Sequence, residues 1–292
     1  MATSVRDSGS LGDYYAEIIC ARAGVADPRI KAAFAAVPRE LFLGDGPWPI
    51  AVEGDGYVRT PSADPAFVYA DVLVGLVPER SLNNGEPSSH ARWLGAAAIT
   101  AGETVAHVGA GSGYYSAIIA ELVGREGRLE AFEIDEALAA AAARNLSPWT
   151  HASVQSRSGL ETPFPVADVI YVNAGVSRLA EAWLDAIRPG GRIVVPLTVR
   201  GWGAMMMFTA RNNQVFDARV ISPVAIFPCV GGQDEVMTKR LAEAYGFPPD
   251  DAGPPTATPL SPAVQSLRRG TAPDNSCWLA GDGWWLSTRP AG

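Results

Sequence analysis

The chain has few cysteines, and their spacing excludes two classes of protein. Its 292 residues include only Cys20, Cys229 and Cys277, an odd number at wide spacing, with no C-x-x-C pair and no neighbouring histidine. A disulfide framework needs paired cysteines, and a structural zinc site needs clustered thiols and imidazoles. We therefore expect reduced thiols and no bound metal.

The chain also lacks a surplus of basic charge. It has 23 lysines and arginines against 31 aspartates and glutamates, which gives a net charge of −8, and it contains no basic run. Proteins that bind nucleic acid or anionic membranes usually carry a basic patch. We expect neither partner, and a small molecule or a peptide fits better as substrate.

Long apolar runs are missing as well. No run approaches the roughly 18 residues that a membrane span requires, and the first residues lack the apolar stretch of a secretory signal. We therefore expect a cytoplasmic protein without a membrane segment. What is present is a hydrophobic content of 48% with 18% charged residues, enough to bury a sizeable core.

The pattern along the chain predicts three segments, which are residues 1–65, 66–200 and 201–292. In the first, apolar residues recur at helical spacing from Asp13 to Leu43, with a break at Gly24 to Pro28, and predict two short helices. Gly44 to Pro65 is rich in Gly, Pro and Asp and is expected to be a long loop.

The middle segment alternates strand and helix patterns, which is typical of a parallel sheet with helices on both faces. The predicted strands are Thr104–Val108, Arg128–Ile134, Ala152–Gln155, Asp168–Val172 and Arg192–Leu197. The predicted helices are Tyr114–Val123, Glu136–Leu146 and Ser177–Ile187. This order predicts an α/β, Rossmann-like fold with a doubly wound, mostly parallel sheet.

The last segment predicts a β-rich extension. The strand-like runs from Met205 and from Val215 flank Asn212-Asn213 and indicate an antiparallel hairpin. Residues 245–262 are dense in Pro, Gly and Ala and are expected to form a linker. A terminal hairpin is predicted around the turn that ends at Gly283.

A glycine-rich turn stands between the first predicted strand and its helix, and this context makes it informative. Glycines permit a tight turn and the close approach of a ligand, while the helix N-terminus offers free N–H groups. The spacing is G-x-G-x-G, and Tyr114 stands where a dinucleotide site would place a third glycine. A ligand without a pyrophosphate, such as S-adenosylmethionine, suits the turn better. The candidate residues are Gly109, Ala110, Gly111 and Gly113.

The next strand ends in acid roughly 20 residues beyond the glycines, where a carboxylate can accept hydrogen bonds from both hydroxyls of a ribose. Glu133 is the candidate for this role, with a solvated strand end as the less favoured alternative, and Asp135 can cap the following helix. Further candidates for cofactor contact are Ser158 and Gly159 after the third strand and Asn173 after the fourth.

Three motifs in order resemble the protein-L-isoaspartate O-methyltransferase family between about Val37 and Leu197. They are V-P-R-E-L-F from Val37, G-A-G-S-G-Y from Gly109, and P-G-G-R-I-V-V-P from Pro189. The resemblance implies a class I methyltransferase that uses S-adenosylmethionine. One element differs from the family pattern. The family carries S-A-P-H before the strand that leads into the glycine turn. Alignment of the prolines places Gly85 at the position of that serine.

This departure puts isoaspartate repair in question. The segments from Asn83 to Ala91, from Phe227 to Gly232 and from Cys277 to Leu279 look more like a divergent branch associated with lanthipeptides. Resemblance to that branch implies methylation of a carboxylate, C-terminal or on an aspartyl or isoaspartyl side chain, in a ribosomally made, modified precursor peptide. The alternatives are isoaspartate repair and a small-molecule O-methyltransferase of natural-product biosynthesis.

Methyl transfer to a carboxylate needs alignment rather than a base, since a carboxyl group is already ionised at neutral pH. Asn84, Ser88, Ser89 and His90 supply hydrogen-bond donors in one loop, and the catalytic candidates among them are Asn84, Ser88 and His90. Structural roles also explain them, Ser88 as a helix cap and His90 as a core residue.

Two other classes of function fit less well. A nucleic-acid base methyltransferase would carry Asn/Asp-Pro-Pro-aromatic after the fourth strand, where this chain has Asn-Ala-Gly-Val from Asn173. A non-catalytic module would have lost the glycines or the acid. Four tryptophans in the extension are candidate anchors for a peptide, or ordinary core: Trp202, Trp278, Trp284 and Trp285.

Overall fold

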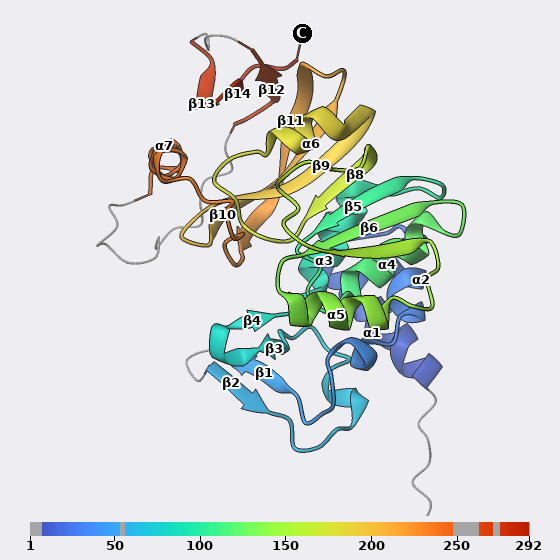
Figure 1. Cartoon of the computed structure of the whole chain (residues 1–292). Helices are drawn as coiled ribbons and strands as arrows, with labels where there is room; N and C mark the ends of the chain where they lie inside the picture. The colour runs from blue at the N-terminus through green and yellow to red at the C-terminus, as the bar shows by residue number, and fades with distance from the viewer. Residues whose placement is uncertain (1–7, 53–55, 248–262, 271–274, 292) are drawn as a thin grey trace, which may run out of the picture. The chain divides into compact units, whose positions relative to one another are not determined.

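The structure, a computed structural model, describes residues 8–52, 56–247, 263–270 and 275–291 (Figure 1). The chain divides into two units. The first comprises Met1–Glu103 and Ala110–Arg157, and the second comprises Thr104–Gly109 and Ser158–Gly292. In the described part of the chain, no helix is long and apolar enough to cross a membrane. Those same ranges also contain no cluster of His, Cys, Asp and Glu that can hold a metal ion.

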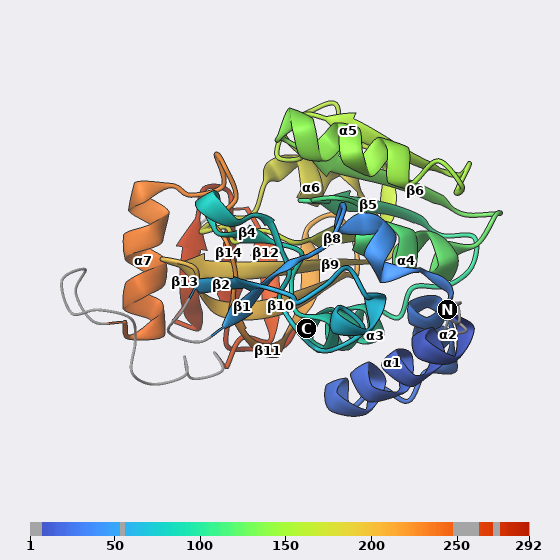
Figure 2. The same ribbon diagram turned by 90° about the horizontal axis from the view of Figure 1, so that it is seen from below.

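The first unit begins with the two predicted helices, α1 (Ser8–Ala23) and α2 (Pro28–Ala36). Asp27 caps α2, because its side chain accepts a hydrogen bond from the amide of Arg29. Helix α1 packs against α2 and against α3 (Pro87–Ala97), as Figure 2 shows. The predicted pair of helices is confirmed, although α2 ends before a short 3-10 turn, η1 (Arg39–Phe42).

The region predicted as a long loop contains a hairpin, so that prediction was wrong. Strand β1 (Pro49–Val52) pairs antiparallel with β2 (Gly56–Arg59). The flanks close the hairpin, since the Trp48 amide donates to Thr60 Oγ1 at 3.0 Å. The density of Gly, Pro and Asp concealed two short strands. Four further short elements follow: η2 (Pro65–Phe67), η3 (Pro78–Arg80) and the antiparallel pair β3 (Gly75–Val77) and β4 (Leu82–Asn83).

The rest of the first unit alternates helix and strand as predicted. Its elements are α4 (Tyr114–Val123), β6 (Arg128–Glu133), α5 (Glu136–Asn145) and β7 (Ala152–Ser156). Strands β6 and β7 run parallel. Helix α4 carries apolar side chains on nearly every face and is almost wholly buried, whereas α5 buries only Ala139 and Ala142.

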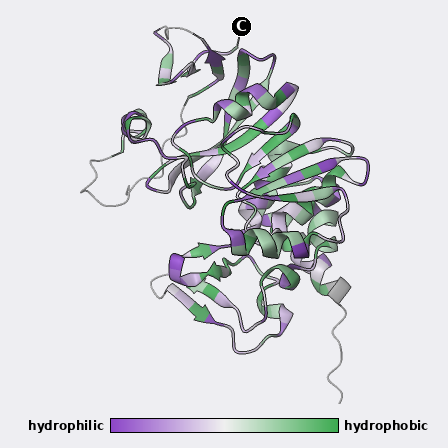
Figure 3. Ribbon diagram, viewed as in Figure 1, coloured by the Kyte–Doolittle hydropathy of each residue, from purple (hydrophilic) through white to green (hydrophobic). Residues whose placement is uncertain are grey.

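The second unit holds three parallel strands, β5 (Thr104–Val108), β8 (Ala167–Val172) and β9 (Ile187–Val199). They are largely apolar (Figure 3) and mostly buried, as expected of strands covered on both faces. Helix α6 (Glu181–Ala186) is shorter than the predicted Ser177–Ile187. Its expected first residue, Ser177, is bound elsewhere, because its amide donates to the carbonyl of Gly232.

Antiparallel strands extend this sheet. They are β10 (Trp202–Ala210), β11 (Val215–Ala225), β12 (Ser266–Arg269), β13 (Cys277–Gly281) and β14 (Trp284–Ser287). Within the unit the order is β13-β14-β12-β11-β10-β9-β8-β5. Both predicted hairpins are confirmed. Helix α7 (Glu235–Tyr245) packs against β13 and β9, and most of the predicted linker, residues 248–262, lies outside the described residues.

The four tryptophans of the extension differ in exposure. Trp284 and Trp285 are buried, at 3% and 8% exposed, which supports the alternative that they are ordinary core residues. Trp278 is half-buried and packs edge-on against Tyr245. Only Trp202 is exposed, at 43%, which leaves it as the one candidate among the four that offers a broad surface.

Candidate active site

Three glycines shape the turn between β5 and α4. Gly109, Gly111 and Gly113 have φ values of +80°, +56° and +93°, all in the left-handed region that other residues rarely adopt. At Gly113 a side chain would also press on Ala142 of α5, 3.3 Å from the position of its Cβ. The backbone conformation of the turn therefore requires these glycines.

Glu133 lies at the end of β6, in the same unit as most of this turn, and contacts it directly. Its Oε2 accepts a hydrogen bond from the amide of Gly111 at 2.7 Å, and its Oε1 accepts one from the amide of Asp135 at 3.0 Å. Burial raises the pKa of Glu133, although these backbone hydrogen bonds act in the opposite direction. A buried carboxylate has further lone pairs that can accept hydrogen bonds from ligand hydroxyls.

Asp135 caps α5, as the sequence suggested. Its Oδ1 accepts hydrogen bonds from the amides of Ala137 and Leu138, both at 3.1 Å. Its Oδ2 accepts a hydrogen bond from Arg80 Nη1 at 2.5 Å, and this bond is the main reason that the pKa of Asp135 is lowered. The two acids therefore have different roles. Asp135 caps α5, whereas Glu133 accepts a hydrogen bond from the glycine turn.

The turn has the properties of a ligand cradle. Among the described residues, Ser112 Oγ is buried without a hydrogen-bond partner, while the Ser112 carbonyl accepts a hydrogen bond from Asn145 Nδ2 at 2.9 Å. Leu76 Cδ1 lies 3.3 Å from the position of a Cβ on Gly111. An unpaired buried hydroxyl needs a partner. These residues fit a cofactor that brings hydroxyl and carboxylate groups to the turn, as S-adenosylmethionine does.

The remaining cofactor candidates lie in the second unit. Asn173 follows β8, and its side chain reaches the carbonyl of Gly109, with 3.4 Å between Nδ2 and the oxygen. Ser158 and Gly159 belong to another turn, in which Ser158 Oγ accepts from the amide of Leu160 and the Gly159 carbonyl accepts from Trp183 Nε1 at 2.7 Å. Within the second unit the structure thus brings Asn173 to Gly109, and the adenine contact of Ser158 and Gly159 stays a prediction.

The residues predicted to orient the acceptor carboxylate lie in the first unit. Asn84 lies between β4 and α3, whereas Ser88 and His90 lie in the first turns of α3. We call residues 84–90 the acceptor loop. Asn84 is buried, and its Oδ1 accepts hydrogen bonds from Arg39 Nη2 at 3.2 Å and from the amide of Val74 at 3.4 Å. Two donors fix the orientation of the amide, so its Nδ2 must point the other way. That nitrogen is buried and has no hydrogen-bond partner in the part of the chain that the structure describes.

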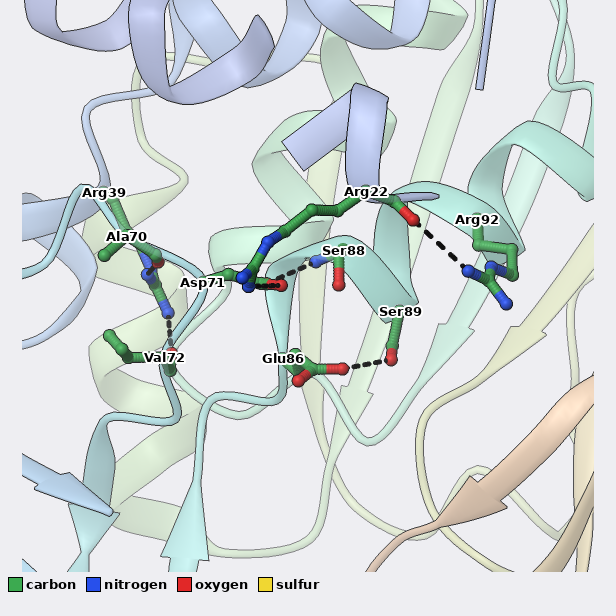
Figure 4. A network of polar contacts seen from close by, with 9 residues as sticks. All are labelled: Arg22, Arg39, Ala70, Asp71, Val72, Glu86, Ser88, Ser89 and Arg92. Atoms are coloured by element: carbon green, nitrogen blue, oxygen red, sulfur yellow. Dashed lines mark hydrogen bonds and ion pairs between the residues drawn. The ribbon is translucent and has the colours of Figure 1, made fainter. Parts of the chain in front are cut away.

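Arg39 organises this region and was missed as a functional residue by the sequence reasoning. Its side chain is wholly buried and donates to the carbonyls of Ala70 and Val72, both at 2.7 Å (Figure 4). It also donates to the carbonyl of Val68 at 2.6 Å. Its guanidinium also lies 5.8 Å from the ring centre of Tyr114, in the first turn of α4. The one indication in the sequence was that Arg39 belongs to the V-P-R motif, one of the three motifs that resemble the family.

Ser88 does not cap α3, so that alternative was wrong. The N-cap of α3 is Glu86, and the Ser88 amide instead donates to Asp71 Oδ1 at 2.9 Å (Figure 4). Asp71 also binds Arg22 at 3.0 Å, and Ser89 Oγ donates to Glu86 at 2.6 Å. Ser88 is half-buried in the first turn of α3, where its hydroxyl is a candidate donor.

His90 is buried and its ring stacks on Tyr115, with centroids 3.4 Å apart and planes at 5°. Tyr115 in turn donates a hydrogen bond from its hydroxyl to the carbonyl of Gly85 at 3.0 Å. Because Tyr115 belongs to the first turn of α4, this stack ties the acceptor loop to the helix that follows the glycine turn. His107, by contrast, is a core residue of β5, and burial lowers its pKa to about 3.

Comparison with known proteins tests the fold and the family. The family model described as protein-L-isoaspartate(D-aspartate) O-methyltransferase matches residues 17–234. Among proteins with that name, one from Rhodopseudomonas palustris is 32% identical over 215 residues, which cover 72% of this chain and 88% of the relative. One from Brucella anthropi is 25% identical over 218 residues and covers 72% of this chain and 89% of its own length.

Solved structures show the same fold. A protein-L-isoaspartate O-methyltransferase matches with a TM-score of 0.62 at 22% identity, over 74% of this chain and 65% of that one. A Plasmodium falciparum protein, described as of the same kind and in complex with S-adenosyl-L-homocysteine, matches with a TM-score of 0.59 at 16% identity, over 74% of this chain and 97% of that one.

The predicted Rossmann-like, class I methyltransferase fold is thereby confirmed. So are the recognised family, the cofactor S-adenosylmethionine and the assignment as a methyltransferase enzyme. The matched residues include the glycine turn, Glu133 and the loop that carries Asn84 and His90. The chain therefore belongs to the protein-L-isoaspartate(D-aspartate) O-methyltransferase family.

Proposed function

We propose that this S-adenosylmethionine-dependent O-methyltransferase methylates a carboxylate of a peptide or protein, and that an isoaspartyl carboxylate is the preferred acceptor. The observation that carries the proposal is the family match over residues 17–234, which spans both the cofactor turn and the acceptor loop. The relatives are named for the isoaspartyl acceptor. The free cysteines support a reducing compartment, and we place the reaction in the cytoplasm.

For this reaction the residues of the site mainly have to bind the cofactor and to align the acceptor carboxylate with its methyl group. S-adenosylmethionine supplies an electrophilic methyl group, and an ionised carboxylate attacks it without a general base. Glu133 and the glycine turn would bind the cofactor, with Ser112, Asn173, Ser158 and Gly159 as further contacts. Asn84 and Ser88 would orient the acceptor, and His90 would hold their loop against Tyr115.

A second candidate is the tailoring of one particular peptide, such as a ribosomally made, modified precursor. Gly85 favours it, because this residue stands where the family carries serine. The structure gives residue 85 no room for a side chain, since His90 Cδ2 lies 3.0 Å from the Cβ position and Nε2 lies closer still. In addition, β12, β13 and β14 lie beyond the residues that the family model matches. Together with the exposed Trp202 they offer surface for a specific partner.

One experiment tests both candidates. The protein is incubated with S-adenosylmethionine and three peptides of one sequence, with isoaspartate, aspartate or asparagine at one position. The expected product is the isoaspartyl peptide, heavier by one methylene, which loses methanol in mild alkali because a methyl ester is base-labile. An alkali-stable methyl group would contradict carboxylate methylation altogether.

Varying the flanking sequence separates the candidates. A repair enzyme must accept isoaspartate in many contexts, so its kcat/KM should change little among unrelated isoaspartyl peptides. A tailoring enzyme draws positioning energy from remote contacts, so it should turn over only one family of sequences. The Gly111→Val variant, whose side chain would occupy the cradle, is the inactive control.

A further inference from the structure

The short hairpin formed by β3, η3 and β4, residues 75–83, is held firmly although it has few strand pairs. Val77 pairs with Leu82 and Gly75 with Asn83. The hydroxyl of Tyr57 from β2 donates to the Ser81 carbonyl at 3.1 Å and accepts from Asn83 Nδ2 at 3.2 Å. These bonds hold the hairpin to the neighbouring strands and give its turn a defined position.

Two side chains of this hairpin contact the cofactor region of the same unit. Leu76 Cδ1 lies 3.3 Å from the position of a Cβ on Gly111, in the middle of the glycine turn. Arg80, at the far end of the hairpin, pairs with Asp135 at 2.5 Å. Figure 1 shows the hairpin beside α5, the helix that Asp135 caps. One contact is apolar and the other is ionic.

Both contacts reach residues that hold Glu133. Gly111 and Asp135 donate their amides to the two carboxylate oxygens of Glu133. The hairpin therefore contacts the glycine turn at Leu76 and the residue after the cofactor acid at Arg80. Any movement of the hairpin away from the turn would separate Arg80 from Asp135 and expose the backbone around Gly111.

We propose that hairpin 75–83 is a cover for the cofactor site, in which Leu76 supplies the apolar contact and the Arg80–Asp135 pair is a latch that slows release of the cofactor and its product. The inference goes beyond the proposed function, because it holds whichever carboxylate is methylated.

The solvent exposure of the Arg80–Asp135 pair determines how strongly we expect it to slow release of the ligand. The side chain of Arg80 is 54% exposed and that of Asp135 is 19% exposed. Ion pairs of this kind contribute little and are screened by salt, since the Debye length falls from about 10 Å at 0.1 M to about 3 Å at 1 M. Loss of the latch should therefore speed release of the ligand about two- to fivefold at low salt.

The test measures dissociation of S-adenosyl-L-homocysteine by stopped-flow fluorescence, and its Kd by calorimetry, with no acceptor present. Arg80→Ala removes the cation, whereas Asp135→Asn removes the anion and retains a side-chain oxygen to cap α5. Each variant should release the ligand about two- to fivefold faster at low salt, and the double variant should be no faster than either one. At about 1 M salt the differences should largely disappear.

Two further variants complete the design. Arg128→Ala, on β6 of the same unit, breaks the looser Arg128–Glu130 pair at 3.7 Å and should leave release unchanged. Leu76→Ala should speed release at every salt concentration, because its contact is apolar. The proposal is wrong if Arg80→Ala, Asp135→Asn and Leu76→Ala all release the ligand at the rate of the Arg128→Ala control. Failure of every peptide to be methylated would reject the proposed acceptor and leave these rates unaffected.

Discussion

The imidazole of His90 lies where a side chain on Gly85 would have to stand. Gly85 has a φ of +76°, and a Cβ placed on it would lie 3.0 Å from His90 Cδ2 and closer to Nε2. Stacking on Tyr115 prevents the ring from turning away without loss of that contact. Residues 85 and 90 are therefore coupled, and a change at one determines what the other can be.

This coupling predicts a non-additive pair of variants. Gly85→Ala should lower the free energy of unfolding by about 1–3 kcal/mol, because it adds both backbone strain and a steric clash. In the His90→Ala background the clash is absent and only the backbone strain remains. Gly85→Ala should therefore lower the free energy of unfolding by less in that background. Urea unfolding of the four proteins measures both values. Equal losses in the two backgrounds would show that residues 85 and 90 are independent.

Arg39 should be indispensable to the acceptor loop. Arg39→Met leaves the carbonyls of Val68, Ala70 and Val72 without their donor, and we expect the free energy of unfolding to fall by at least about 1–3 kcal/mol. Arg59→Met is the matched control, because Arg59 is exposed and, within the described ranges, donates to a single carbonyl, that of Pro47. Thermal unfolding compares the two, and equal shifts would contradict a special role for Arg39.

Glu133 should dominate the binding of S-adenosylmethionine. Glu133→Ala is expected to weaken binding by roughly 1.5–3 kcal/mol, the scale of hydrogen bonds to a charged group. Glu136→Ala, an exposed acid three residues further on, should leave the Kd unchanged. Calorimetry measures both, and unchanged affinity in Glu133→Ala would assign the ribose contact to another residue.

Stability in mild acid should depend on His107. Its pKa is about 3 in the folded chain against an ordinary value of 6.5, so between these values the unfolded chain binds a proton that the folded chain does not. The contribution of neutral His107 to the free energy of unfolding is therefore fully present above pH 6.5. It falls as the pH drops below that value, by up to about 1.4 kcal/mol per pH unit. His107→Leu should show a flatter dependence in urea unfolding from pH 7.5 to 5. An unchanged slope would assign the acid sensitivity to other groups.

Two tryptophans of the extension should respond in opposite ways. Trp284 is buried, so Trp284→Ala should cost roughly 3–5 kcal/mol of stability. Trp202 is exposed, so Trp202→Ala should leave the melting temperature nearly unchanged. If the extension binds peptide, Trp202→Ala should raise KM for the preferred peptide and leave the Kd of S-adenosylmethionine unaltered. An unchanged KM would remove Trp202 from the recognition surface.

The parallel core was predictable because its local signals agree with one another. The boundaries of α4 match the predicted Tyr114–Val123, since apolar residues fill the segment and glycines flank it on both sides. Glu133 was placed beside the glycine turn by spacing alone, because a strand and a helix of ordinary length separate them. The roles predicted for the individual site residues stay predictions until binding and activity are measured.

The acceptor region was harder to predict because its contacts join residues far apart in the sequence. No periodicity links Arg39 to Val72, or Ser88 to its actual partner Asp71, 17 residues earlier. The β1–β2 and β3–β4 hairpins have strands of two to four residues, too short to show an alternating pattern. Leu76 and Arg80 escaped notice for this reason.

The pairing of β9 on both sides has a consequence for expression of a truncated protein. Residues Arg192 to Val199 of β9 pair antiparallel with β10 on one side. On the other side, Ile187 and Arg192 to Val194 pair parallel with β8. A chain cut after residue 200 would keep the first partner and lose the second, which would leave an unpaired apolar edge through Ile193, Val195 and Leu197. Such edges recruit strands from other molecules. We therefore expect the shortened protein to aggregate into inclusion bodies, because the strand that covers this edge of β9 would be missing.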